Sequence, residues 1–269
     1  VKAKINKLIL GLTSLGILIL LMLPANLYAS HYRYGTMSWA NPWDNGTIRL
    51  KMQNAWKLSS QTLGTISNES GEINWGDGSS ETVQRKIISV DSTEGSYVTE
   101  IGSNSTGTWV TGVLKTYTDN GTYIVSWTGG DRIAGIQNSS LSEADWRLET
   151  KVNIGGTFAS NDSSVSAVPP IVQIQDNTNF NYQVVATDAD GDSMGYRWGT
   201  MKKFVDNTST DTYAPPTGMT LSSSGLISWD VHDSGGQATS EDQMWGTFVM
   251  VEDLDSSSGD NKSYIPIDF

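Results

Sequence analysis

Two short segments constrain the fold more than any other part of the chain. The first is the turn Trp75-Gly76-Asp77-Gly78-Ser79, and the second is the run Tyr117-Thr118-Asp119-Asn120-Gly121-Thr122-Tyr123-Ile124-Val125-Ser126-Trp127. Glycine tolerates positive φ, so the two glycines favour a tight turn around Asp77, whose carboxylate can bond its own turn. In the run, Tyr123, Val125 and Trp127 take alternate positions, which places them on one face of a β-strand.

The two segments together resemble the polycystic kidney disease (PKD) type of immunoglobulin-like β-sandwich. In that family one strand ends in W-G-D-G, and a later strand is entered through a Tyr and left through G-T-Y-x-V. The resemblance is firm from Ile73 to Trp127 and implies a spacer or binding module rather than an enzyme. Residues 31–39 have no counterpart in the PKD pattern, so a separate lineage for the first module stays open.

Residues 1–29 have the pattern of a secretory signal peptide. Three lysines precede an apolar run from Leu8 to Leu23, and small residues surround Ala29. The run is short for a bilayer span and is interrupted by Gly and hydroxyl residues, so an uncleaved anchor is the less favoured alternative. Only such an anchor would place the protein in a membrane. We therefore predict export to the cell surface or the extracellular space.

Composition narrows the class of protein further. The chain has no cysteine, which excludes disulfides, and its formal net charge of −12 argues against nucleic acid and suits calcium or cationic partners. Its many Gly, Ser, Thr and Asn residues and its lack of helix-forming runs predict an all-β chain with many turns.

Strand positions follow from period-2 alternation. The clearest case is residues 48–56, where Ile48, Leu50, Met52 and Trp56 share one face. Residues 31–39, 82–90 and 146–154 are further predicted strands. Residues 92–107 are mostly polar and are predicted to form a long loop or a frayed edge hairpin.

A second module is predicted to begin at the Pro-rich stretch 167–171. It contains T-D-x-D-G-D at residues 187–192 and P-x-G-M-x-L-x-x-x-G-x-I-x-W at residues 216–229. In this order the motifs resemble the cadherin-like, dystroglycan-type immunoglobulin repeats of bacterial surface proteins. We therefore predict two tandem β-sandwiches, PKD-like over residues 30–165 and cadherin-like over residues 166–269. Residues 264–269 are predicted to be a final strand, and we expect the chain to be the front end of a longer protein.

The acidic residues of the second module are the main candidate site. Asp188, Asp190 and Asp192 alternate along a turn, and calcium takes six to eight oxygen ligands. The cadherin-like resemblance implies calcium at these three residues, with Asp253 and Asp255 as additional ligands. The alternative is a turn whose carboxylates cap backbone amides, and both stay open. For Asp77, between two glycines, a structural role in its own turn is favoured.

Support for catalysis is sparse. The chain has two histidines, His31 and His232, and lacks H-E-x-x-H and G-x-S-x-G motifs. A carboxylate pair for glycoside hydrolysis stays open, because the separation of two carboxylates is a three-dimensional property.

Exposed aromatic side chains would favour sugar binding. Trp75, Trp127 and Trp229 are predicted to be buried, whereas Trp43 and Trp245 lie in loops and are the candidates for exposure. Asn-x-Ser/Thr sequons, such as those at Asn45, Asn68 and Asn104, matter only in a eukaryotic secretory route.

The sequence therefore predicts an exported, non-enzymatic structural or adhesion protein, stabilised by calcium if the acidic turn binds it. Its partner would be a protein or glycan on a cell surface or matrix, or another copy of the chain. The alternative is a carbohydrate-binding accessory region of a larger extracellular hydrolase. A flat pair of exposed aromatics would favour the alternative, and acidic clusters at the module junction would favour the adhesion protein.

Overall fold

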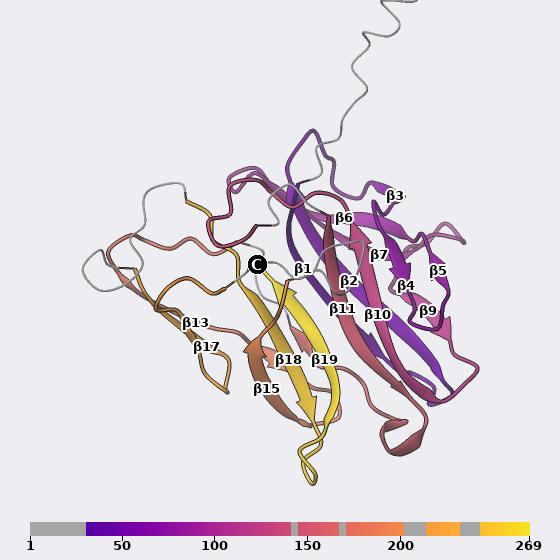
Figure 1. The fold of residues 1–269 in the computed structure, drawn as a ribbon. Helices are drawn as coiled ribbons and strands as arrows, with labels where there is room; N and C mark the ends of the chain where they lie inside the picture. The colour runs from indigo at the N-terminus through magenta and orange to yellow at the C-terminus, as the bar shows by residue number, and fades with distance from the viewer. Residues whose placement is uncertain (1–30, 141–144, 167–170, 202–213, 232–242) are drawn as a thin grey trace, which may run out of the picture.

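The computed structural model describes residues 31–140, 145–166, 171–201, 214–231 and 243–269. These residues form β-strands joined by turns, and their one helical element is the single 3-10 turn η1 (Gly156–Phe158). The predicted all-β fold class is confirmed, with a sheet that curls into a sandwich-like shape (Figure 1). The predicted signal peptide lies outside the described residues.

The main sheet has 14 strands in the described part of the chain. Its path follows the order β3-β6-β7-β2-β1-β19-β11-β10-β4-β5, with β8, β9, β15 and β18 paired beside it. Its strands are β1 (Tyr32–Ala40), β2 (Thr47–Lys57), β3 (Ile66–Asn68), β4 (Glu72–Asn74), β5 (Ser80–Glu81), β6 (Gln84–Asp91), β7 (Ser96–Ser103), β8 (Val110–Thr111), β9 (Val113–Thr116), β10 (Gly121–Gly129), β11 (Trp146–Ile154), β15 (Ser193–Trp198), β18 (Phe248–Leu254) and β19 (Asn261–Asp268). Two small sheets pair β12 (Val165–Ser166) with β14 (Ala186–Thr187), and β13 (Asn179–Gln183) with β17 (Leu226–Asp230) and β16 (Thr220–Leu221).

The predicted alternation is confirmed in β2 and β10. In β2, Ile48, Leu50 and Met52 are buried while the intervening lysine at position 51 is exposed. In β10, Val125 and Trp127 are fully buried in one cluster and Tyr123 packs partly buried against it, although Ser126 between them is buried too. These strands form because every second side chain transfers apolar surface from water into the core.

The final strand, β19, lies in the middle of the main sheet rather than at an edge. It pairs with β1 through Asp268 and Ile267, with β11 through Tyr264, and with β18 along most of its length. Figure 1 shows β18 and β19, in yellow, beside β1 and β11. The segments before and after residue 166 are therefore joined by backbone hydrogen bonds, and the division into two domains at that residue stays a prediction.

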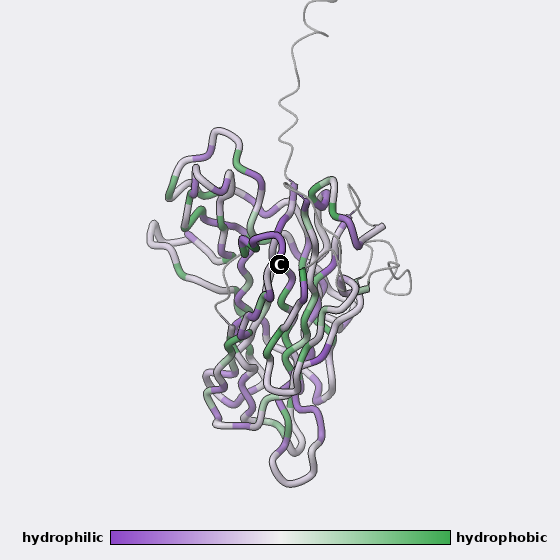
Figure 2. The backbone as a smooth tube through the Cα atoms, turned by 90° about the vertical axis from the view of Figure 1, so that its left-hand side faces the viewer, coloured by the Kyte–Doolittle hydropathy of each residue, from purple (hydrophilic) through white to green (hydrophobic). Residues whose placement is uncertain are grey.

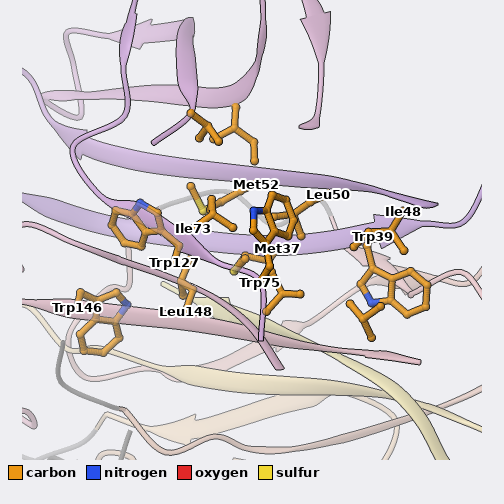
Figure 3. Packing of buried hydrophobic residues seen from close by; sticks show 14 of the residues in the cluster. Met37, Trp39, Ile48, Leu50, Met52, Ile73, Trp75, Trp127, Trp146 and Leu148 are labelled. Carbon is orange, nitrogen blue, oxygen red and sulfur yellow. The ribbon is translucent and has the colours of Figure 1, made fainter. Parts of the chain in front are cut away.

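Two hydrophobic clusters lie on the two faces of these shared strands. In β18, Phe248 and Met250 belong to the first cluster, while Val249 and Val251 belong to the second. A strand covered on both faces is apolar at consecutive positions, as β18 is. Figure 2 shows the hydrophobic stretches concentrated along the strands in the body of the molecule. The first cluster contains five tryptophans, several of which Figure 3 shows packed with Leu50, Ile73 and Leu148.

Of the two alternatives predicted for residues 92–107, the long loop is wrong, and the hairpin forms with β6 but is not at an edge of the sheet. Residues 96–103 form β7, which pairs with β6 on one side and β2 on the other and is the third strand along the path of the main sheet. Its inward residues are Tyr97, Thr99 and Ile101. The Thr99 hydroxyl donates to the carbonyl of Asn54 at 3.2 Å and accepts from the Trp56 indole at 3.2 Å. Those hydrogen bonds allow a polar residue to occupy a core position.

Candidate metal centre

The acidic turn of residues 188–192 joins β14 to β15 at the surface of the second segment. Asp188 accepts hydrogen bonds through Oδ1 from the backbone N–H groups of Asp190, at 2.9 Å, and Asp192, at 3.1 Å. One oxygen of Asp188 thus caps the turn, as the structural alternative required. Its other oxygen, Oδ2, is buried and has no hydrogen-bond partner among the described residues.

Asp253 reaches the same place from β18 and is fully buried. Its Oδ2 accepts from Asn161 Nδ2 at 2.7 Å and from the Ser263 hydroxyl at 3.2 Å. Its Oδ1 is buried without a partner in the described part of the chain. Burial raises the pKa of Asp253 to about 6, because desolvation disfavours the charged form.

These two carboxylates and that of Asp192 form the candidate cluster. One oxygen atom from each of Asp188, Asp192 and Asp253 lies within 4.8 Å of the others. Strand pairing explains the approach, because Ser193, directly after the turn, pairs with Leu254, directly after Asp253. Three of the five predicted ligands are therefore brought together by the fold.

The structure does not bring Asp190 and Asp255 into this cluster. Asp190 accepts from the backbone N–H of Asp162 at 2.7 Å. Asp255 caps its own turn, accepting from the backbone N–H of Ser257 at 3.0 Å and of Ser258 at 2.7 Å. Hydrogen bonds from these two serines hold the pKa of Asp255 well below its usual range. Asp190 thus ties the acidic turn to the loop after η1, Asp255 caps its own turn, and their role as ligands stays a prediction.

Two residues of the site were missed by sequence reasoning. Asn161 comes from the loop after η1, in the first segment, and its Oδ1 is buried with no partner among the described residues. Lys262, in β19, forms an ion pair with Asp192. Partial burial opposes the charge of Lys262, but the hydrogen bond to Asp192 and the nearby carboxylates raise its pKa overall. No local sequence pattern marks either residue, because both are close to the acidic turn only in three dimensions.

The arrangement suits a hard divalent cation. Three carboxylates converge, and buried acceptors that lack a donor are stabilised by a cation that supplies positive charge. Calcium accepts such a set because it takes carboxylate, amide and water oxygens in flexible geometry. Lys262 already neutralises part of the negative charge, so it would compete with the cation for Asp192.

Asp77 has the structural role that its sequence context predicted. Its Oδ1 accepts from the backbone N–H of Ser79 at 2.9 Å and from the Ser79 hydroxyl at 2.6 Å. It also forms an ion pair with Lys115 at 2.6 Å, which the sequence did not indicate. The Tyr117 hydroxyl donates to the carbonyl of Trp75 at 2.9 Å and so joins the two motifs.

The loop tryptophans differ from each other. Trp43 is 52 % exposed in the turn between β1 and β2. Trp245 is partly buried and packs edge-on against the buried Trp229, with the ring centroids 5.7 Å apart. Trp245 lines a groove of about 650 Å³ between the two segments. These two loop tryptophans thus do not form the flat exposed pair that would favour a carbohydrate-binding module. Of the two histidines, His232 lies outside the described residues.

Comparison with known proteins shows that the first segment is similar to one protein family. Residues 33–155 match the family model for the N-terminal region of integrin beta-like proteins A–E. The match contains both the W-G-D-G turn and the G-T-Y-x-V strand, together with most of residues 31–39, which have no place in the PKD pattern. It supports an integrin beta-like relationship and not PKD or cadherin-like repeats specifically, so those two resemblances stay predictions.

The curated relatives are much longer proteins. Integrin beta-like protein C of Dictyostelium discoideum is 30 % identical in an alignment 214 residues long, which covers 73 % of this chain and 10 % of that protein. Integrin beta-like protein A of the same organism is 24 % identical over 263 residues, covering 90 % of this chain and 12 % of that protein. The chain thus spans about a tenth of the length of these relatives. No solved structure matches. Within the described ranges, no helix is long and apolar enough to cross a membrane.

Proposed function

We propose that this chain is an exported, non-enzymatic protein of the cell surface or extracellular space that acts in adhesion. The observation that carries the proposal is the match of residues 33–155 to the N-terminal region of integrin beta-like proteins. The net charge of −12 and the signal-like residues 1–29 agree with it. The partner is a protein or glycan on another cell or in the matrix, or a second copy of the chain.

Expression of the full chain in eukaryotic cells tests export and adhesion together. We expect the protein at the cell surface or in the medium, with a mature N-terminus near Ser30. A surface coated with the purified protein should retain more cells than an albumin-coated surface. N-terminal sequencing that finds Val1 on membrane-bound protein would establish an uncleaved anchor instead. Retention equal to that on albumin would contradict the adhesion proposal.

The same proposal includes a calcium ion at Asp188, Asp192 and Asp253. It is supported by the 4.8 Å grouping of their oxygens and by the buried, unpartnered acceptors Asp188 Oδ2 and Asp253 Oδ1 within the described residues. Asn161, from the first segment, donates to Asp253 Oδ2 at 2.7 Å and would orient that carboxylate, with water completing the shell of the ion. All three ligands lie after position 166, and the ion would bind next to the hydrogen bond that joins Asp253 to Asn161 of the first segment.

Calcium should therefore raise the melting temperature. A cation that binds only the folded state stabilises it by RT ln(1 + [Ca²⁺]/Kd), about 2.7 kcal/mol at a hundredfold excess over Kd. For a protein of this size that corresponds to an increase in Tm of about 5–10 °C. Melts in millimolar calcium and in chelator, at equal ionic strength, measure the difference.

Matched variants locate the effect. Asp188→Asn should abolish the calcium-dependent increase, whereas Asp255→Asn, the same chemical change outside the cluster, should retain it. Lys262→Gln should strengthen calcium binding, because it removes the ammonium group that pairs with Asp192. Identical melts of the parent protein with and without calcium would leave the acidic residues as a capped turn.

A further inference from the structure

The turn between β1 and β2 carries a large apolar side chain that is half exposed and belongs to neither hydrophobic cluster. Its sequence is Trp43-Asp44-Asn45-Gly46-Thr47, and Trp43 is 52 % exposed. Burying an indole removes a large apolar area from water, so leaving half of it exposed forfeits stabilisation. Asn45, two positions later, is also exposed and begins an Asn-Gly-Thr sequon.

The backbone of this turn is well defined. Asp44 and Gly46, on either side of Asn45, have φ values of 51° and 80°. The Asn45 carboxamide oxygen accepts from the backbone N–H of Thr47 at 3.1 Å. The backbone N–H of Tyr117 donates to the carbonyl of Gly46 at 3.0 Å and anchors the turn to the neighbouring segment. The carboxamide of Asn45 is thus held by its oxygen, while its nitrogen, Nδ2, is the atom that an N-linked glycan would carry.

We propose that Asn45 carries an N-linked glycan whose first sugar packs against Trp43. In the transfer, Nδ2 loses one proton and forms a bond to C1 of the sugar. The C1–O bond of a lipid-linked oligosaccharide diphosphate breaks, and the lipid diphosphate leaves. Asn45 keeps its carboxamide oxygen, so the hydrogen bond from Thr47 survives. The apolar face of the sugar ring then covers part of the indole that the protein itself leaves in water.

The inference rests on the export part of the proposed function, because glycan transfer takes place in a eukaryotic secretory route. The curated relatives come from Dictyostelium discoideum, which is a eukaryote. The structure also separates Asn45 from other sequons. Asn68, on β3, is exposed but has no aromatic residue two positions before it.

Two other sequons have their carboxamides committed to the fold. Asn138 donates through Nδ2 to the carbonyl of Gly246 at 2.8 Å and accepts from the N–H of Gly246 at 2.9 Å. Asn161 is buried and donates to Asp253. A glycan on either nitrogen would displace these hydrogen bonds, so we assign neither as an acceptor.

Glycan occupancy is tested by expressing the full chain in eukaryotic secretory cells. A parallel fusion replaces residues 1–29 with the signal sequence of the host, so that failure of the native leader is distinguished from failure of glycan transfer. Peptide mass spectrometry after enzymatic glycan release should show conversion of Asn45 to aspartate, and Asn45→Gln should lose one glycan mass. Secreted protein with Asn45 unmodified in the fusion would overturn the proposal.

A double-variant cycle tests the contact with Trp43. In glycosylated protein, Asn45→Gln should lower Tm by about 2 °C or more, a shift measurable for a protein of this size. In a Trp43→Ala background the same substitution should have no such effect, and Asn68→Gln, the same change at another sequon, should not depend on Trp43. Unglycosylated protein from bacteria gives the effect of each substitution alone. An equal loss with and without Trp43 would overturn the packing of the sugar on the indole.

Discussion

Replacement of Trp127 by alanine is expected to destabilise the protein by about 3–5 kcal/mol, because it removes a large aromatic side chain from a packed core. Trp127 is fully buried in β10. Its ring centroid lies 5.6 Å from that of Tyr32 and 6.1 Å from that of Trp56, the latter in an edge-on arrangement. Gly71 and Gly129 approach the indole so closely that a Cβ atom at either position would overlap it. The cavity would therefore lie among β1, β2, β10 and the residues around Gly71. These parts of the chain could fill it only if their backbone moved.

Chemical denaturation of unglycosylated protein measures this loss. Folded domains are stable by only about 5–15 kcal/mol, so the variant should unfold at a much lower denaturant concentration or fail to fold. Trp43→Ala is the matched control, because it removes the same side chain from an exposed turn and should change stability by about 0.5 kcal/mol or less. A Tm for Trp127→Ala within a degree or two of the parent would contradict the strand register described above.

Sequence reasoning succeeded where alternation involves large apolar residues. Ile48, Leu50 and Met52 in β2, and Val125 and Trp127 in β10, are buried as predicted because each follows the two-residue repeat of a strand. It failed for β7, whose inward positions include Thr99. From the sequence, a buried threonine that hydrogen-bonds to the neighbouring strand looks the same as a threonine in a loop. Alternation alone cannot distinguish the two.

The position of β19 illustrates a different limit. The strand itself was predicted from residues 264–269, but its pairing with β1 joins the two ends of the described chain. Such long-range partners depend on topology, and no local pattern in either strand specifies the other.

The candidate metal site also combines residues that the sequence predicted with residues that only the fold brings together. The acidic turn was visible in the sequence, and the fold brings Asp253 to it through the pairing of β15 with β18. Asn161 lies in a loop and Lys262 lies in β19. Both are recognised as residues of the site only once the strands are paired. Asp190 and Asp255 satisfied the same compositional criterion as the cluster residues, but their carboxylates accept hydrogen bonds from backbone N–H groups outside the cluster. Composition thus located the region, whereas geometry selected the residues.

The second large effect is expected at the buried ion pair between Arg132 and Asp268. Both side chains are almost inaccessible, with exposed fractions of 1 % and 0 %. Arg132 donates through Nη2 to Asp268 Oδ1 at 2.7 Å and through Nη1 to Asp268 Oδ2. The guanidinium also lies 3.9 Å from the ring centroid of Trp146, close enough for a cation–π interaction. Because Asp268 ends β19, this pair fixes the last strand to the segment that precedes β11.

Arg132→Met should destabilise the protein by about 3–5 kcal/mol at pH 7, because it leaves the carboxylate of Asp268 buried without its partner. Burial raises the pKa of Asp268, and Arg132 opposes that increase. Without the arginine the folded-state pKa rises further above that of the unfolded chain, about 3.9. The resulting penalty grows as pH rises above the unfolded value and disappears as pH falls below it. The stability difference between Arg132→Met and the parent should therefore be smaller at pH 4 than at pH 7.

A compensating variant separates the lost ion pair from lost packing. Arg132→Met combined with Asp268→Leu removes both charges, and replacing a buried ion pair by apolar residues is often neutral or stabilising. The double variant should therefore recover most of the stability that Arg132→Met loses at pH 7, and its stability difference from the parent should vary little between pH 4 and pH 7. Urea denaturation at the two pH values measures all three proteins. A double variant that recovers no stability relative to Arg132→Met at pH 7 would show that the unpaired Asp268 carboxylate does not cause the loss, and that the arginine acts mainly through its contacts with the rings of Trp146 and Tyr32.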